Sequence, residues 1–414
     1  MTERTNLKRR LKYVATINDD VLGEDTDRDY ELEYVDISNV DSSGTVNQTT
    51  NYTFAKAPSR ARRCVRHGDV IVSCVRTYLQ AIAPVRDPPD NLVVSTGFAV
   101  VRPREGVLDT AFSSYALREP SFLSEVAMRS VGVNYPAINA SELRDIPVCV
   151  PSQTKQQTIT AFLDHETSQI DALIAAKQRL LKLTFEKRSA LITRSVTRGL
   201  NSNMRLRDSG ISWLGRIPTH WDTERARWLL TERDARSQTG QEDLLSVSHL
   251  TGVTLRSEKQ VNMFKAESTE GYKICRRGDL VVNTLWAWMG AMGVADMDGI
   301  VSPAYNVYEP SSRLSRSYLD MIVRLPVFAQ EVTRHSKGVW SSRLRLYPEG
   351  LFETHLPVPP LSEQAEIGEF IATECSKLDS LTNTADLSVR LLQERRSALI
   401  AGAVAGRIDI GAET

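Results

Sequence analysis

Hydrophobic positions recur at intervals of three and four residues along two long stretches of the chain, residues 152–200 and 362–409. This spacing places the apolar side chains in one stripe along an α-helix. A helix of roughly 40 residues extends about 60 Å, and its single apolar stripe needs a partner, which the other stretch supplies. The stripe residues, which we expect to form a coiled coil or to dock partners, are Ile159, Phe162, Ile170, Leu173 and Leu191 in the first stretch and Ile367, Phe370, Leu378, Leu381 and Leu399 in the second.

The two stretches are copies of one sequence. With an offset of 208 residues, positions 154–200 align with 362–408 without a gap and share 15 identical pairs over 47 positions, including an unbroken Arg-Ser-Ala-Leu-Ile run. Upstream, an offset of 210 aligns residues 67–72 with 277–282 and Pro147 with Pro357. The regions between these anchors differ almost completely. The chain is therefore an internal repeat in which each copy has a divergent globular part followed by a similar helix.

Short apolar runs in the globular parts have the length and composition of β-strands. The strands predicted in this way are 70–73, 98–101 and 280–283, while 113–117 and 317–323 have helical spacing. The fold class is therefore mixed α/β, with domains at 1–151 and 224–361, long helices at 152–200 and 362–409, and an extended connector at 201–223. This order predicts antiparallel helices in a coiled coil, with the two domains separated and related by a pseudo-twofold axis.

Composition narrows the picture only slightly. The 414 residues contain 51 Lys+Arg and 51 Asp+Glu, so net charge supplies no electrostatic footprint for nucleic acid. The five cysteines are scattered without C-x-x-C spacing, which favours a reduced, cytoplasmic protein without a structural metal. The N-terminus is charged and lacks an apolar signal core, and no run reaches the length of a membrane span, so no membrane partner is expected.

Catalytic motifs do not account for the sequence. It contains no phosphate-binding loop, no dinucleotide fingerprint, no zinc-protease motif and no nucleophile elbow. Asp87-Pro88-Pro89-Asp90 resembles the Asp-Pro-Pro-aromatic motif of amino-methyltransferases, in which the aromatic residue stacks on a flipped base. Here that position is Asp90, and a glycine-rich cofactor loop is missing. We therefore interpret the segment as a turn and expect no catalytic residues.

Basic, amide and aromatic residues gather at matching places in the two copies. Arginine can pair with guanine, asparagine with adenine, and hydroxyls with phosphate or base edges. Taken singly, each residue is better explained by a solvated surface or, for the tryptophans, by the core, but their recurrence in both copies favours DNA contact. The candidates are Arg60, Arg62, Arg63, Arg66, Arg76, Thr77, Asn134 and Tyr135 in the first copy, and Lys273, Arg276, Trp286, Trp288, Lys337, Trp340, Ser341, Ser342, Arg343 and Arg345 in the second.

Three segments carry a resemblance to a known family. They are Pro-Val-Pro-Pro-Leu-Ser-Glu-Gln at 357–364, the segment 209–221 that ends in Thr-His-Trp, and Arg-Arg-Gly-Asp-Leu-Val-Val-Asn at 276–283. In these segments and in its repeat order the whole chain resembles the specificity subunits of type I restriction-modification systems. The first copy departs from the pattern at 149–156, which reads Cys-Val-Pro-Ser-Gln-Thr-Lys-Gln. This departure affects only where the first helix begins.

The resemblance implies a non-catalytic adaptor that reads double-stranded DNA. Each target-recognition domain of that family reads one half of an asymmetric bipartite site, and the paired helices set the spacer. The helices also dock two methyltransferase subunits, which bring S-adenosylmethionine and methylate adenine at N6. Restriction subunits add ATP- and Mg-dependent translocation and cleavage. This chain is then expected to bind none of these cofactors itself.

Three other functions remain open at this stage. A coiled-coil scaffold could use its two domains to bind proteins instead of DNA. An orphan or antagonist specificity subunit could dock partners without reading a site. A free-standing methyltransferase is disfavoured by the missing cofactor motif.

Overall fold

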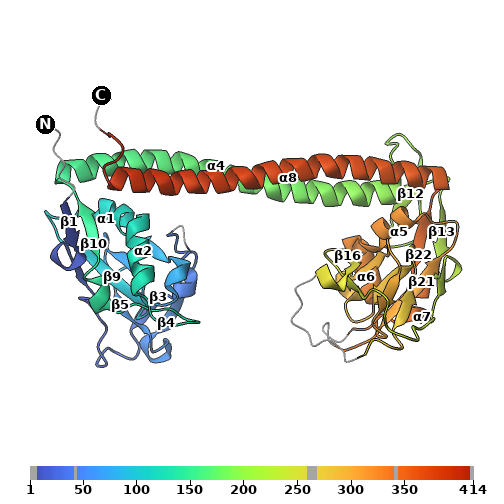
Figure 1. The fold of residues 1–414 in the computed structure, drawn as a ribbon, viewed down its shortest axis with the longest axis horizontal. Coiled ribbons are helices and arrows are strands. Elements are labelled where there is room, and N and C mark those ends of the chain that lie inside the picture. Colours follow the sequence, from blue (N-terminus) through green and yellow to red (C-terminus); the bar gives the residue numbers. More distant parts are fainter. Residues whose placement is uncertain (1–6, 42–43, 259–267, 340–343, 411–414) are drawn as a thin grey trace. The chain divides into compact units, whose positions relative to one another are not determined.

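The computed structural model describes residues 7–41, 44–258, 268–339 and 344–410. The chain divides into two compact units, residues 1–178 with 386–414 (unit 1) and residues 179–385 (unit 2). Two helices, α4 (Gln153–Arg198) and α8 (Leu361–Val404), are long enough to take part in both units. Each unit therefore contains a globular domain, the beginning of one long helix and the end of the other (Figure 1).

Unit 1 is built on two four-stranded sheets with the strand orders β2-β9-β6-β7 and β4-β3-β8-β5, and a two-stranded sheet β1-β10. All pairs are antiparallel except β3 with β8. The strands are β1 (Leu7–Arg10), β2 (Ala15–Ile17), β3 (Glu31–Val35), β4 (Thr50–Thr53), β5 (Ala61–Cys64), β6 (Val70–Ser73), β7 (Ile82–Pro84), β8 (Leu92–Ser95), β9 (Phe98–Pro103) and β10 (Pro147–Val150). The short helices are α1 (Thr110–Ala116), α2 (Pro120–Arg129) and α3 (Ala140–Leu143).

Unit 2 repeats part of this topology. Its four-stranded sheet has the order β14-β21-β18-β19, and β13-β22, β15-β16, β17-β20 and β11-β12 form pairs. The strands are β11 (Leu206–Asp208), β12 (Arg216–Pro218), β13 (Asp222–Arg225), β14 (Leu230–Glu232), β15 (Leu245–Ser248), β16 (Gly252–Leu255), β17 (Lys273–Cys275), β18 (Leu280–Asn283), β19 (Met292–Val294), β20 (Gly299–Val301), β21 (Tyr305–Pro310) and β22 (His355–Val358). The short helices are α5 (Arg316–Val323), α6 (Pro326–Arg334) and α7 (Pro348–Phe352).

The predicted mixed α/β class and the two long helices are confirmed, and the internal repeat is visible in the topology. The sheet β2-β9-β6-β7 corresponds strand for strand to β14-β21-β18-β19, and α1 and α2 correspond to α5 and α6. The predicted strands at 70–73, 98–101 and 280–283 are β6, part of β9 and β18. The predicted helical segments lie in α1 and α5, shifted by a few residues.

Within each unit the two long helices run side by side in opposite directions (Figure 1). In unit 1, Ile159 on α4 and Ile400 on α8 share one core, and Arg396 Nε lies 2.9 Å from Asp171 Oδ1. In unit 2 the same pair recurs with the helices exchanged, because Arg188 on α4 bonds Asp379 on α8. No helix among the described residues is long and apolar enough to cross a membrane.

The stripe residues, predicted to form a coiled coil or to dock partners, divide into covered and exposed positions. Ile159, Ile170, Ile367 and Leu378 are buried, and Phe162, Leu191 and Leu399 pack at the core edge. Leu173, Phe370 and Leu381 are instead exposed. The stripe is wider than one helix contact, so the domain and the second helix cover only part of it.

The segment interpreted as an extended connector is a folded part of unit 2. Strands β11 and β12 form a hairpin, and Leu214, Ile217 and Trp221 are buried in the unit 2 core. Trp221 Nε1 donates to Glu363 Oε2 at 2.9 Å, and His220 Nε2 lies 2.8 Å from the same oxygen. The Thr-His-Trp segment therefore holds the first turn of α8.

A buried glutamine joins each long helix to its own domain. Gln156 Oε1 accepts from the Asp109 backbone at 2.7 Å, and its Nε2 donates to the carbonyls of Val107 and Pro151 at 3.0 and 2.8 Å. Gln364, its repeat partner, accepts from Ser315 and donates to Arg313 and Pro359 at 2.7, 2.8 and 2.8 Å. Asp109 and Ser315 are the N-caps of α1 and α5. Each glutamine therefore fixes the long helix against the first helix of its domain.

We expect Gln364→Ala to lower the free energy of unfolding of unit 2 by at least about 2 kcal/mol, since each buried group left unpaired costs about 1–3 kcal/mol. Gln156→Ala should do the same for unit 1, and urea denaturation measures both losses. Gln157 is the exposed neighbour of Gln156. Gln157→Ala should change stability by less than about 0.5 kcal/mol, and equal losses for Gln156→Ala and Gln157→Ala would contradict the joining role.

Candidate nucleic-acid interface

Two loops meet at one end of strand β6 in the first copy. The turn loop, residues 75–80, contains the 3₁₀ turn Thr77–Leu79. The bridge loop, residues 131–137, is held beside it because Val75 and Val131 both form β-bridges with Ala137. Backbone hydrogen bonds continue the junction, with Ile138 N donating to Cys74 O at 2.9 Å. The loops are thus fixed by their backbones, and their outward side chains are free for contact.

The turn loop has a strained backbone. Arg76 and Gln80, which flank the 3₁₀ turn, have φ values of 54° and 52°. Residues other than glycine pay about 1–2 kcal/mol in this left-handed region. Such strain is concentrated at functional sites, so it adds weight to this loop as a contact surface.

The predicted residues of these two loops come together. The Arg76 guanidinium lies 4.9 Å from the Tyr135 ring centroid, and Asn134 is exposed on the same bridge loop. Thr77 differs from the expectation, because it is buried and its hydroxyl bonds Ser130 Oγ at 2.8 Å. Thr77 therefore supports the loop and does not present a group to a ligand.

The second copy has the same construction at the end of β18. Its turn loop, residues 285–290, contains the 3₁₀ turn Ala287–Met289, and Gly290 occupies the position of Gln80 with φ 86°. Its bridge loop, residues 337–345, is closed by the pair Lys337 and Arg345, and Leu346 N donates to Thr284 O at 3.0 Å. Trp340, Ser341, Ser342 and Arg343 lie outside the described residues.

Aromatic rings dominate the second turn loop. Trp286 and Trp288 stack with centroids 6.1 Å apart and an interplanar angle of 22°. Trp286 is exposed and Trp288 is half-buried, and Lys337 and Arg345 are exposed on the neighbouring bridge loop. Flat rings beside cations form a surface that suits bases and phosphates.

The arginines of 60–66 form a separate group around edge strand β5. Arg60 and Arg66 are exposed, and Arg66 Nη2 pairs with Asp20 at 2.7 Å. Arg62 lies 4.5 Å from the Phe54 ring centroid. Arg63 differs from the prediction that it contacts DNA. Its guanidinium donates internally to Asn18 Oδ1 and the Phe98 carbonyl, and burial lowers its pKa.

The Gly-Asp turns before β6 and β18 have a structural role in both copies. Asp69 is buried, accepts from Arg66 N at 2.8 Å and pairs with Arg102 at 2.8 Å. Asp279 does the same with Arg276 N at 2.8 Å and Arg233 at 2.9 Å. Arg66 and Arg276 therefore lie at one end of strands β6 and β18, and the turn loops lie at the other.

Lys273 also differs from the prediction that it contacts DNA. Only 5% of it is exposed, and its ammonium donates to Asn306 Oδ1 at 3.0 Å. A buried lysine with an internal acceptor has no group to offer a ligand. Arg276, by contrast, has an exposed side chain.

Sequence reasoning missed the apolar tips of the turn loops. Tyr78 and Leu79 are exposed in the first copy, and Leu285 and Met289 are exposed in the second. The offset of 210 that aligns β6 with β18 also aligns Tyr78 with Trp288, so the repeat register contained the signal. Within the described part of the chain, no three His, Cys, Asp or Glu side chains gather as a metal site.

The chain combines two mixed α/β domains, each with a two-loop surface, with two long helices. No family model and no curated protein matches the chain. Among solved structures, a chain from a study of complex assembly and conformational transition of the type I R-M system matches with a TM-score of 0.74 and 18% identity, covering 97% of this chain and 98% of that chain. The HsdS subunit from Thermoanaerobacter tengcongensis matches with a TM-score of 0.52 and 20% identity, covering 97% of both chains. The fold is that of the type I restriction-modification S subunits, which confirms the resemblance at the level of structure.

Two arginines next to the same carboxylate should respond differently to substitution. Arg233→Ala leaves the buried Asp279 without its charge partner, and we expect a loss of about 3–5 kcal/mol in stability. Arg276→Ala removes only an exposed side chain, and its stability should stay within about 0.5 kcal/mol of the parent. Chemical denaturation of both variants checks this, and a comparable loss for Arg276→Ala would show that its side chain is also structural.

Proposed function

We propose that this chain is the DNA-reading specificity subunit of a type I restriction-modification complex, and that it recognises an asymmetric bipartite site. The observation that carries this proposal is the recurrence of the same two-loop surface in both copies with different side chains. One surface presents Arg76, Asn134 and Tyr135, and the other presents Trp286, Lys337 and Arg345. A shared frame with divergent contact residues suits two domains that read different bases.

The two-loop backbone that both copies share suggests how a protein with nearly no net charge could read a DNA sequence. Phosphate contacts from exposed arginines would set the register, and a few loop side chains would discriminate base edges in the major groove. Arg60 lies just before β5, and Arg66 and Arg276 lie at the ends of β6 and β18 opposite the turn loops. All three are exposed and suit the first task. The balanced total charge implies that partner subunits contribute much of the affinity.

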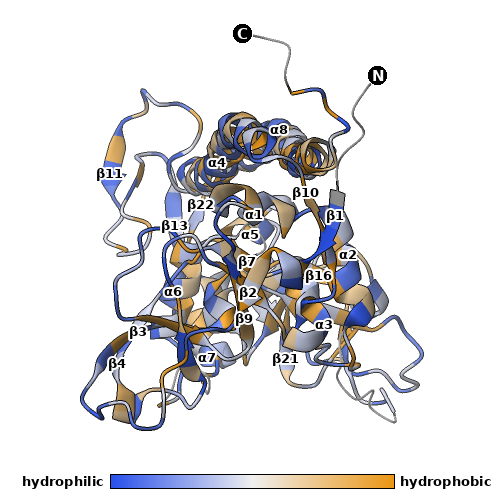
Figure 2. Cartoon of the chain, turned by 90° about the vertical axis from the view of Figure 1, so that its left-hand side faces the viewer, coloured by the Kyte–Doolittle hydropathy of each residue, from blue (hydrophilic) through white to orange (hydrophobic). Residues whose placement is uncertain are grey.

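The second part of the proposal is that the two long helices bind two modification subunits. Exposed leucines are retained in both copies of the helix repeat. Leu173 and Leu381 are 51% and 42% exposed, and Leu183 and Leu391 are 51% and 54% exposed. Figure 2, which views the helices nearly end on, shows that both hydrophobic and hydrophilic residues occur along them.

Exposed leucines that are kept in both copies of the repeat are better explained by a protein interface than by chance. Most positions of the repeat differ between copies, yet these leucines do not. Leu173 and Leu391 belong to unit 1, and Leu381 and Leu183 belong to unit 2. Each unit therefore has equivalent exposed leucines, which suits two copies of one partner. The methyltransferase chemistry, with S-adenosylmethionine, would belong to that partner, and ATP and Mg to restriction subunits.

Co-expression with the modification subunit in a methylation-free host tests the DNA-reading proposal. Single-molecule sequencing should find N6-methyladenine in one motif of two short blocks with a fixed gap. Arg76→Ala should relax only one block, and Trp286→Ala only the other, at about 1–3 kcal/mol per lost base contact, or roughly 5- to 150-fold in discrimination.

Other patterns of methylation distinguish the alternatives. Loss of both blocks in either variant would contradict independent reading by the two domains. A stable complex without methylation would identify an orphan adaptor, and no complex with the modification subunit would favour a general interaction scaffold.

Introducing charge into the leucine surfaces tests docking. Leu173→Asp with Leu391→Asp should remove one modification subunit, and Leu183→Asp with Leu381→Asp the other, because a buried interface leucine replaced by a charge costs well over about 1 kcal/mol. Native mass spectrometry counts the bound subunits. Leu250→Asp, at an exposed leucine outside the helices, is the matched control and should leave stoichiometry unchanged. Full assembly in both double variants would refute these surfaces as docking sites.

A further inference from the structure

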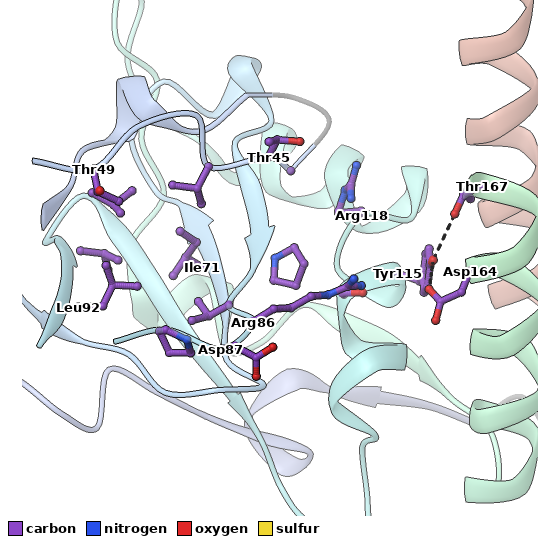
Figure 3. A pocket seen from close by; sticks show the side chains of 18 of the residues that line it. Thr45, Thr49, Ile71, Arg86, Asp87, Leu92, Tyr115, Arg118, Asp164 and Thr167 are labelled. Atoms are coloured by element: carbon purple, nitrogen blue, oxygen red, sulfur yellow. Dashed lines mark hydrogen bonds between the residues drawn. The ribbon is translucent and has the colours of Figure 1, made fainter. Parts of the chain in front are cut away.

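A cavity of about 830 Å³ lies in unit 1 between the globular domain and the long helices. Leu92 lies on one side of it, and Tyr115, Arg118 and residues of α4 lie on the other (Figure 3). The lining also includes Val35 and Pro88. Figure 3 shows Arg86 extending from the side of Leu92 toward Arg118 and Tyr115. Cavities of about 300–1,000 Å³ with an apolar wall and a few polar groups are typical of small-molecule sites.

Arg118 is a half-buried cation that Asp171 and Asp41 attract electrostatically. Among the described residues, its guanidinium has no carboxylate within 4.0 Å and donates no side-chain hydrogen bond, and Arg86 is in the same condition. Burial, together with the nearby Arg396, lowers the pKa of Arg118 to about 10. A half-buried cation facing a cavity is stabilised when an anion occupies that cavity.

The second copy of the repeat provides an internal comparison. Glu119 and Leu325 are the N-caps of α2 and α6, so Arg118 corresponds to Arg324. Arg324 is satisfied, because it pairs with Asp320 at 3.4 Å and donates to Leu250 O at 2.9 Å. The position of Asp320 is Ser114 in the first copy. The carboxylate partner is therefore missing on the cavity side of unit 1.

Arg86 also makes the first copy more positive than the second at an equivalent position. Gly68 and Asp69 exchange backbone hydrogen bonds with Val85, as Gly278 and Asp279 do with Ala295. Arg86 therefore corresponds to Asp296. At these two equivalent positions the first copy replaces two carboxylates by a guanidinium and a hydroxyl, and both changes face one cavity.

The carboxylates that line the cavity are mostly engaged. Asp171 pairs with Arg396, Asp164 accepts the Tyr115 hydroxyl at 2.5 Å, and Asp87 lies 3.1 Å from His67. Glu33 pairs in register with Leu92, which lies across the cavity from Arg118 (Figure 3). Of the three guanidinium groups that line the cavity, only that of Arg396 has a carboxylate partner among the described residues, and those of Arg118 and Arg86 do not.

We propose that this cavity binds a phosphate-bearing small molecule of nucleotide size, with its phosphate between Arg118 and Arg86. Guanidinium groups recognise phosphate through paired N–H donors, and the apolar lining residues Val35, Pro88 and Leu92 offer contacts for the remainder of the ligand. The proposal needs neither DNA nor a partner subunit, so it stands or falls independently of the proposed function.

Isothermal titration of the full chain with inorganic phosphate, AMP and ATP tests the site. We expect saturable binding to the parent chain and a roughly 10- to 100-fold weaker Kd in Arg118→Ala and in Arg86→Asp, which installs the second-copy residue at an exposed position. Arg324→Ala, at the equivalent but already satisfied arginine, should bind like the parent. Thermal unfolding confirms that each variant is folded, and Arg86→Asp preserves the test if Arg118→Ala is not.

The outcomes separate the possible ligands. Tighter binding of AMP or ATP than of inorganic phosphate supports a nucleotide, and equal binding supports a plain phosphate site. No saturation at millimolar concentration, or unchanged binding in both variants, overturns the proposal. Displacement of the bound ligand by short duplex DNA would instead assign these arginines to the DNA backbone and would also overturn it.

Discussion

The position of each long helix on its domain depends on the hydrogen bonds of one buried glutamine at the start of that helix. Its side chain bonds the N-cap residue of the first domain helix on one side and the carbonyl preceding the long helix on the other. An amide can satisfy such a donor and two acceptors at once, whereas an apolar residue would leave buried backbone groups unpaired. The helix direction is therefore fixed to the domain core by hydrogen bonds with defined geometry, and hydrophobic packing alone would permit sliding.

A fixed helix allows the rest of each unit to diverge. The ion pair between Asp171 and Arg396, repeated as Arg188 with Asp379, and the buried Gly-Asp turns are the same in both copies. The side chains on the turn and bridge loops are different. Side chains are the same in both copies where they are buried and paired. They differ where only the backbone is held by hydrogen bonds. Such a division is what the proposed reading of two different half-sites would require.

The fold was largely predictable because its signals are periodic or repeated. Three- and four-residue spacing identified α4 and α8, and the offset of 210 located β6 and β18. The candidate site was less predictable, since sequence does not show which way an arginine points. Arg63 and Lys273 turned inward to carbonyl and amide oxygens, and Trp221 entered the core from a segment interpreted as a connector. Spacing likewise identified the stripe that contains Leu173 but not how much of it a neighbouring element covers.

The backbone junction between the turn loop and the bridge loop has an evolutionary consequence. Ile138 with Cys74, and Leu346 with Thr284, hold the loops through N–H and C=O groups that every non-proline residue possesses. Substitutions at the loop tips therefore leave the anchoring bonds in place, and the bridge loop is two residues longer in the second copy without losing its closing pair. New binding preferences can arise there by point changes or small insertions at little cost in stability, which gives a lineage with this scaffold a short mutational route to new targets.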